Sequence, residues 1–319
     1  MEAGQIGASS PAIARRLEAP SRRYGETAIY FLLAACAVVS VVTTTAIVIS
    51  LLEPAIEFFG EVPIGDFLFG TDWGPTFEPA SFGVLPVVIG TLSVTLWALV
   101  FAIPIGLACA VYLSEYASRR TRKLVKPTLE ILAGIPTIAL GFFALNFLTQ
   151  DVLVKVWPGE FLGGPPMIFN VLAGSLAIAL MIVPIIASIS EDAMTAVPNG
   201  LREGAYAMGA TKAHVATRVV FPAALSGIVA SIILAVSRAI GETMIVVIAV
   251  GQTPNLTFNP TESVQTMTAF IAGTANGDIG TGTITYKTVF AVALLLFVMT
   301  LVMNLLSIRL VRKYREVYE

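Results

Sequence analysis

Long apolar runs constrain the fold of this chain more than any other feature of its sequence. A helix that crosses a lipid bilayer needs about 20 predominantly apolar residues, and six runs reach that length. Only 13% of the residues are charged, against about a quarter in a soluble globular domain. We therefore predict an all-α polytopic membrane protein with six transmembrane helices. The runs are residues 28–52, 83–114, 127–149, 167–189, 219–250 and 286–310.

The positions of lysine and arginine predict which helix ends face the cytoplasm. Sixteen of the 19 Lys and Arg residues lie in the N-terminal tail, in residues 119–126, between the fourth and fifth runs, or at the C-terminus. Six crossings place these four segments on one side of the membrane, and loops rich in positive charge stay in the cytoplasm. Both termini are therefore expected to be cytoplasmic.

This topology predicts how the chain is divided. Residues 1–28 form a cytoplasmic tail and residues 29–52 the first transmembrane helix, which is too long for the apolar core of a signal peptide. Residues 53–82 hold six acidic residues and no Lys or Arg, and we expect them to form an extracytoplasmic loop. Residues 83–315 form the main transmembrane domain, with a cytoplasmic loop over residues 191–218.

A polar segment of about twenty residues, Leu201–Pro222, interrupts the apolar runs. It reads Glu203-Gly204-Ala205, then Gly209 after three residues, then Val-Val-Phe-Pro after nine more. Gly209 can adopt the positive φ that ends a short helix, and Pro222 suits the first turn of a new helix. We interpret the segment as two short helices joined by a tight turn, although an ordinary loop is the alternative.

This spacing resembles the E-A-A-x3-G-x9-I-x-L-P loop of the permeases of binding-protein-dependent ABC importers. Gly204 replaces the first Ala of that pattern, and Val219 and Phe221 replace the later Ile and Leu. The resemblance implies a type I ABC importer (MetI-like) permease fold. It also implies that residues 203–222 form a coupling loop that docks on a separate ATPase, with Glu203, Gly204, Ala205, Gly209 and Pro222 as its characteristic residues.

The chain has no motif of its own for binding ATP or for catalysis. It lacks the G-x4-G-K-[ST] phosphate loop. It has one histidine and two cysteines, and none of them is clustered with carboxylates, so we predict neither a metal site nor an acid–base enzyme. The chain is therefore not expected to be an enzyme on its own or to bind a cofactor, and ATP would be bound by a partner.

Two charged residues, Arg238 and Glu242, lie inside the fifth apolar run. A charge near the middle of a bilayer costs at least about 2.5 kcal/mol, so these side chains should face protein or a polar pathway. Their spacing of four places them on one face of a continuous helix. A buried ion pair that only fixes packing is one interpretation. In the other, the Arg238 guanidinium contacts an oxyanion in transit, and Glu242 holds the guanidinium when the pathway is empty.

The heptapeptide S-R-A-I-G-E-T, from Ser237 to Thr243, resembles the fifth-helix signature of the phosphate-specific (Pst) ABC permeases. The resemblance assigns Arg238 and Glu242 to phosphate passage, and we add Ser237 and Thr243 as pathway residues. The sequence F-G-V-L-P at residues 82–86 and the long acidic loop before it are similar to the PstC type. The PstA type is the alternative.

The resemblance predicts a permease subunit of an ATP-driven inorganic phosphate importer, multi-pass in a bacterial cell membrane. Its expected partners are a second permease (PstA type), an ATPase dimer (PstB type), an extracytoplasmic phosphate-binding protein (PstS type) and membrane lipid, and no nucleic acid. A permease for another oxyanion, such as sulfate or molybdate, remains an alternative. So does a secondary anion transporter that needs no ATPase.

Overall fold

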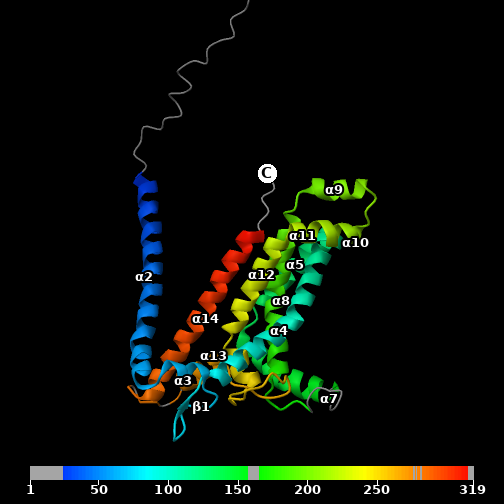
Figure 1. Ribbon diagram of the computed structural model, residues 1–319. Coiled ribbons are helices and arrows are strands. Elements are labelled where there is room, and N and C mark those ends of the chain that lie inside the picture. Colours follow the sequence, from blue (N-terminus) through cyan, green and yellow to red (C-terminus); the bar gives the residue numbers. More distant parts are fainter. Residues whose placement is uncertain (1–23, 157–164, 276, 278, 281, 315–319) are drawn as a thin grey trace, which may run out of the picture. The chain divides into compact units, whose positions relative to one another are not determined.

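The computed structural model describes residues 24–156, 165–275, 277, 279–280 and 282–314. Helices dominate it (Figure 1). The described residues divide into two compact units, the first ending at Ser50 and the second beginning at Leu51. The first 23 residues of the predicted N-terminal tail lie outside the described residues.

The elements follow one another in a simple order. The α-helices are α2 (Tyr24–Glu61), α3 (Ile64–Phe69), α4 (Leu85–Val111), α5 (Arg119–Ala133), α6 (Thr137–Phe143), α7 (Val154–Val156), α8 (Val171–Thr195), α9 (Asn199–Ala207), α10 (Lys212–Val215), α11 (Phe221–Ala223), α12 (Leu225–Ile240), α13 (Met267–Ala275) and α14 (Ile284–Tyr314). The π-helical segments are η1 (Tyr112–Tyr116), η2 (Ala144–Leu153), η4 (Ala216–Val220) and η5 (Val246–Val250). A two-stranded antiparallel hairpin pairs β1 (Trp73–Gly74) with β2 (Ser81–Phe82).

Five helical stretches among the described residues are long and apolar enough to cross a membrane. A sixth crossing exists if Lys212–Ala223 and Leu225–Ile240, which meet at a bend of 72°, count as one broken span. The prediction of an all-α membrane protein is therefore confirmed. The five stretches are Glu26–Glu61, Leu85–Tyr116, Thr137–Val156, Val171–Thr195 and Ile284–Arg309.

The first helix extends beyond its predicted end, because charged residues end an apolar run without ending the helix. α2 ends at Glu61 and not at residue 52, and α3 and the hairpin follow, so much of the predicted 53–82 loop is structured. The apolar run ended at residue 52 because acidic residues begin there, but a helix continues through charged residues as long as its backbone hydrogen bonds continue.

The predicted bounds of the third span, residues 127–149, are wrong, because the crossing stretch is Thr137–Val156. Residues 127–133 belong to α5, an amphipathic helix with no buried residue that ends at Ala133. The crossing helix begins at Thr137, after Pro136 in an extended conformation. Pro136 removes a backbone donor and fixes φ, so the chain changes direction between a charged helix and an apolar one.

Helices α4 and α8 form the centre of the second unit. Ala98, Ala102, Ile178 and Ile182 are among the fully buried residues of the core cluster that the two helices share. A Cβ added to Gly106 would approach the Ile186 side chain to 2.8 Å, so a glycine is required there for the helices to pack this closely. The second unit therefore has a rigid central pair of helices against which α5, α12 and α14 can be placed.

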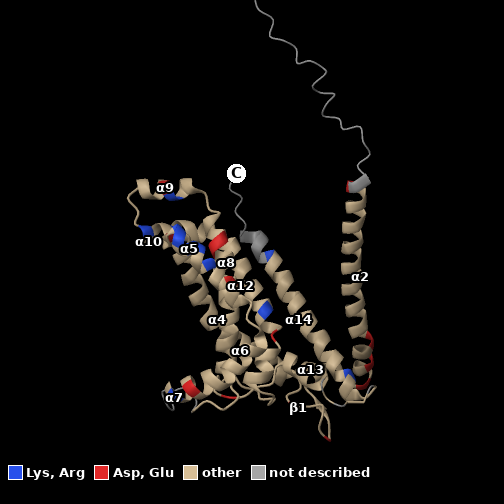
Figure 2. Ribbon diagram, turned by 180° about the vertical axis from the view of Figure 1, so that it is seen from behind, with Lys and Arg blue, Asp and Glu red and all other residues tan. Residues whose placement is uncertain are grey.

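The two ends of the second unit differ in character. Helices α9 and α10 and the last turns of α14 lie at one end, which we call the α9 end, and α3, α7, α13 and the hairpin lie at the other, the hairpin end (Figure 1). Trp73 Nε1 donates to Gln265 Oε1 at 3.0 Å, which ties the hairpin to the segment before α13. Figure 2 shows the basic residues of α5, α9 and α10 gathered at the α9 end.

Candidate functional site

The predicted fifth span is not one continuous helix. α12 ends at Ile240, and the chain is non-helical from Gly241 to Thr243 before a short helical stretch that includes η5. The bend at Ala224 interrupts the predicted span a second time, so the single helix expected over residues 219–250 is wrong. Gly241 lowers the cost of ending a helix at this point. At membrane depth, backbone of this kind is tolerated only where it is buried in protein or lines a water-filled cavity.

Glu242 stabilises this break. Its Oε1 accepts the backbone N–H of Met244 at 3.1 Å and of Ile245 at 3.3 Å, and only 8% of the residue is exposed. The carboxylate therefore caps the helical stretch that follows the break. The Glu242 carbonyl also accepts a hydrogen bond from Thr268 Oγ1 at 2.7 Å, which fixes the break against α13.

The ion pair expected between Arg238 and Glu242 is absent from the described part of the chain. A spacing of four brings two side chains together only on a continuous helix, and the break lies between these two residues. Arg238 is in the last turn of α12, whereas Glu242 is beyond its end. The two residues are neighbours in sequence that belong to different helical stretches.

Arg238 instead faces a groove. The groove has a volume of about 610 Å³, and Arg238 is exposed, with no hydrogen bond or ion pair to any described residue. Helices α5, α8 and α12 form its walls, and its lining residues are Glu130, Ala133, Pro184, Ile185, Ser188, Ile189, Leu234, Ser237 and Arg238. Five of these side chains are apolar and two carry charge, so the guanidinium lies among walls of low dielectric constant.

The four predicted pathway residues separate into two pairs. Ser237 and Arg238 line the groove, whereas Glu242 and Thr243 belong to the break and are not among the lining residues. Ser237 Oγ donates to Asn304 Oδ1 at 2.9 Å, which ties α12 to α14. Thr243 Oγ1 contacts the Gly241 carbonyl at 3.4 Å.

The predicted elbow over residues 201–222 forms two short helices and a tight turn. α9 ends at Ala207, Gly209 has a φ of 81°, and Thr211 Oγ1 accepts the His214 N–H at 3.3 Å to cap α10. Pro222 lies in the first turn of α11. Glu203 and Gly204 are exposed, and Ala205 is half-buried against the core below.

Several side chains of α9 and of the turn that follows it are open to solvent, and some of them are apolar. Leu201 is 39% exposed, Tyr206 43% and Met208 88%. Together with Glu203 they give a small surface at the α9 end, outside the apolar crossings, which could pack against another protein.

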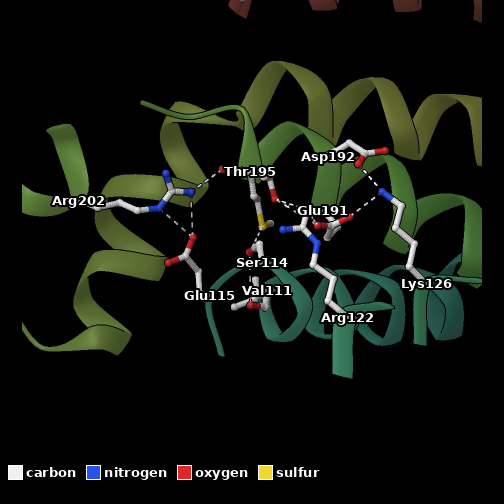
Figure 3. A network of polar contacts seen from close by, with 10 residues as sticks. Val111, Ser114, Glu115, Arg122, Lys126, Glu191, Asp192, Thr195 and Arg202 are labelled. Carbon is white, nitrogen blue, oxygen red and sulfur yellow. Dashed lines mark hydrogen bonds and ion pairs between the residues drawn. The ribbon is translucent and has the colours of Figure 1, made fainter. Parts of the chain in front are cut away.

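Arg202 holds α9 to the rest of the second unit, and sequence reasoning did not single it out. Its guanidinium donates to Glu115 Oε1 at 3.0 Å, to the Met194 carbonyl at 2.7 Å and to the Val197 carbonyl at 2.6 Å. Figure 3 shows Arg202 and Glu115 pointing toward each other. The contact joins α9 to η1 and to the end of α8.

A second polar cluster ties α5 to the end of α8 (Figure 3). Glu191 has a fully buried side chain and pairs with Arg122 and Lys126. Burial lowers the pKa of Lys126, but hydrogen bonds to Asp192 and Glu191 raise it more, and the pKa ends above its usual range. The buried carboxylate thus fixes the amphipathic helix that forms one wall of the groove. We call Arg122, Lys126, Glu191, Asp192 and Thr195 the Glu191 cluster.

Comparison with known proteins places the chain in a family. Residues 102–316 match the family described as binding-protein-dependent transport system inner membrane component. The chain belongs to this family. Its members are membrane components of transport systems, which confirms the resemblance drawn from the 203–222 segment.

Relatives of this permease chain match over most of its length. The probable ABC transporter permease protein YqgH of Bacillus subtilis is 33% identical, with 93% of this chain and 94% of that protein covered. The phosphate transport system permease protein PstC of Mesorhizobium japonicum is 32% identical over 91% of both chains. PstC of Haemophilus influenzae is 33% identical over 85% of this chain and 88% of that protein.

Solved structures confirm the fold. A chain of a bacterial alginate ABC transporter superposes with a TM-score of 0.62 at 17% identity, with 92% of this chain and 98% of that chain covered. A chain of the MetNI methionine ABC transporter superposes with a TM-score of 0.54 at 20% identity, with 73% and 94% covered. The chain therefore has the MetI-like permease fold that was predicted.

Proposed function

We propose that this chain is the transmembrane permease subunit of an ATP-driven importer of inorganic phosphate and forms half of its translocation pathway. The observation that carries the proposal is the unpaired guanidinium of Arg238 in a groove with largely apolar walls. An unpaired charge at this depth is costly, so it is expected to have a ligand during some part of the transport cycle. The relatives named PstC make phosphate the anion to test first.

Arg238 suits this role chemically. A guanidinium is permanently charged and offers a planar set of donors that matches the oxygens of phosphate. In a groove with apolar walls its field is less screened than in water. Glu242 contributes differently from the sequence-based expectation: its carboxylate maintains the break that ends α12 just after Arg238, and Ser237 and Thr243 support the two sides of that break.

The exposed face of α9 is proposed to bind a separate ATPase. Glu203, Gly204 and Gly209 are exposed in α9 and in the turn after it, and Tyr206 and Met208 supply apolar contact area there. Arg202 would transmit a displacement of α9 to α8 and η1 through its three contacts. In this scheme the chain itself hydrolyses no ATP and needs no cofactor.

The proposed assembly contains a second permease of the PstA type, two copies of a PstB-type ATPase and a PstS-type extracytoplasmic binding protein. It lies in a bacterial cell membrane, contacts lipid and binds no nucleic acid. We place the α9 end in the cytoplasm because the basic residues of α5, α9 and α10 gather there (Figure 2), and six crossings would place both termini on that side. The proposed divisions are a cytoplasmic tail at 1–28, a membrane helix at 29–52, an extracytoplasmic segment at 53–82 and a permease domain at 83–315 with its coupling loop at 191–218.

Uptake by the reconstituted assembly tests the proposal. Proteoliposomes that contain ATP should accumulate radioactive phosphate supplied with the binding protein. We expect Arg238→Gln to lower kcat/KM for uptake by about 10- to 100-fold, because a charge-assisted hydrogen bond contributes about 1.5–3 kcal/mol. Lys155→Gln removes the same charge from an exposed pair at the hairpin end and should leave uptake unchanged.

Three results would count against the proposal. If the assembly takes up sulfate and excess phosphate does not reduce that uptake, the transported anion is sulfate and not phosphate. Uptake by the permease chains without the ATPase would favour a secondary transporter. Full phosphate uptake by the Arg238→Gln assembly would remove Arg238 from the pathway.

A further inference from the structure

The groove that contains Arg238 and a second pocket share one lining residue, Glu130. The second pocket has a volume of about 330 Å³ and is lined by Arg122, Lys123, Lys126, Pro127 and Glu130 of α5. Glu130 is the one residue that lines both cavities. An anion that leaves Arg238 along α5 toward the α9 end therefore passes this carboxylate.

Glu130 is the acidic residue that shares the groove with Arg238. Glu242, which the sequence suggested for that place, uses its carboxylate to cap a helical stretch. Glu130 is exposed and makes no hydrogen bond or ion pair with any described residue. The groove thus presents two unpaired charges of opposite sign, one from α5 and one from α12.

The Glu191 cluster explains why Glu130 stays unpaired. Lys126 lies one turn before Glu130 on α5, at the spacing that favours an ion pair. Lys126 is instead bound to Glu191 and Asp192 of α8. Arg122, one further turn away, is bound to Glu191 as well. Lys126, the cation one turn from Glu130, is therefore engaged elsewhere, and the Glu130 carboxylate remains available to a ligand.

A carboxylate beside a guanidinium distinguishes oxyanions by their protons. An ionised carboxylate can only accept hydrogen bonds. At neutral pH inorganic phosphate carries at least one O–H that can donate to it, whereas sulfate carries none and presents only negative oxygens. The Arg238 guanidinium can donate to the unprotonated oxygens of either anion.

We infer that Glu130 is a specificity-determining residue of the pathway: it accepts a hydrogen bond from the O–H of phosphate and repels an oxyanion without a proton. Selectivity of this kind needs an unfavourable contact with the wrong ligand as well as a favourable contact with the right one. This inference rests on the proposed function, because it assumes that an oxyanion passes Arg238.

The selectivity of the groove can be measured from the cytoplasmic side, where the binding protein does not select the anion. Proteoliposomes of the full assembly would be loaded with ATP and with either phosphate or sulfate. The initial rate of radioactive phosphate uptake would then give the internal concentration of each anion that halves the rate. In the wild type, phosphate should inhibit at a lower concentration than sulfate.

Replacing Glu130 should bring the inhibitory concentrations of phosphate and sulfate closer together. We expect Glu130→Gln to lower the ratio of the sulfate to the phosphate inhibitory concentration by about tenfold, because a hydrogen bond to a charged group is lost for phosphate and a repulsion is lost for sulfate. Glu130→Asp keeps an acceptor carboxylate and should retain most of the wild-type ratio. Asp151→Asn changes net charge by the same amount at the exposed pair with Lys155 and should leave the ratio unchanged.

The possible results separate the inference from the function on which it rests. A wild-type assembly that takes up no phosphate would overturn the proposed function and this inference with it. A wild-type assembly that takes up phosphate, combined with a Glu130→Gln ratio within twofold of the wild-type ratio, would overturn the inference alone. A Glu130→Asp ratio as low as that of Glu130→Gln would also overturn it, because the acceptor carboxylate would then be irrelevant.

Discussion

Arg202 shows how much of the α9 end depends on one side chain. Its side chain is 15% exposed and pairs with that of Glu115, which is 5% exposed. It also donates to the Met194 carbonyl in the last turn of α8 and to the Val197 carbonyl just after it. We expect Arg202→Met to lower the free energy of unfolding by about 3 kcal/mol, because it leaves a buried carboxylate without its partner. The midpoint of thermal unfolding in detergent measures the loss.

A double-mutant cycle identifies the origin of that loss. Combining Arg202→Met with Glu115→Gln should cost less than the sum of the two single substitutions, since the amide removes the unpaired charge. Glu203→Gln, at the adjacent exposed position, should change stability by no more than about 0.5 kcal/mol. Additive effects of the first two substitutions would show that their contact is not the source of the stability.

The sequence predicted single residues best where one of them breaks a local pattern. Arg238 is conspicuous as a charge in an apolar run, and it does face a groove. Glu242 was assigned to the wrong contact because the spacing rule assumed an unbroken helix. Arg202 was missed because its partner, Glu115, lies 87 residues earlier. No local pattern reveals a contact between residues so far apart in the chain.

At the scale of elements, α9 and the turn that follows it offer a matched pair of glycines. A Cβ added at Gly204 or at Gly209 would meet no atom within 4 Å, but only Gly209 has a positive φ. Gly209→Ala should therefore cost about 1–2 kcal/mol of backbone strain. Gly204→Ala should gain about 0.5–1 kcal/mol, because glycine weakens a helix interior.

Thermal unfolding of the two alanine variants in detergent tests this prediction. Because neither methyl group would contact another atom, a difference in sign between them can come only from the backbone. Gly204→Ala also restores the second position of the E-A-A pattern, so phosphate uptake by the assembly should be retained. Equal destabilisation by both substitutions would contradict the assignment of the turn.

The existence of the helices was predicted more reliably from the sequence than the residues at which they begin and end. Hydropathy located the apolar crossings because lipid requires them. It merged α5 with the next crossing because apolar residues lie on both sides of Gly134 and Pro136, where one helix ends and the next begins. It also ran through the break at Gly241, where the capping carboxylate of Glu242 lies only one residue further along the chain. Ends of helices depend on caps and on tertiary contacts, which hydropathy does not record.

At the scale of the whole molecule, the distribution of charge makes a prediction about orientation. The α9 end carries the basic residues of α5, α9 and α10 (Figure 2), and positive charge is retained in the cytoplasm. The hairpin end should therefore face outward, where a binding protein could reach it. Two exposed positions can report on this: Met208, which is 88% exposed beside α9, and Phe77, which is 70% exposed at the hairpin.

Cysteine labelling in intact cells would measure the orientation. The natural cysteines, Cys36 and Cys109, are unpaired and would first be replaced by alanine. A maleimide that cannot cross membranes should then label the Phe77→Cys variant in intact cells. It should label the Met208→Cys variant only after the membrane is permeabilised, with the chain produced without its ATPase so that α9 stays uncovered. Labelling of Met208→Cys in intact cells would show that the α9 end faces outward. In that orientation α9 could not contact a cytoplasmic ATPase.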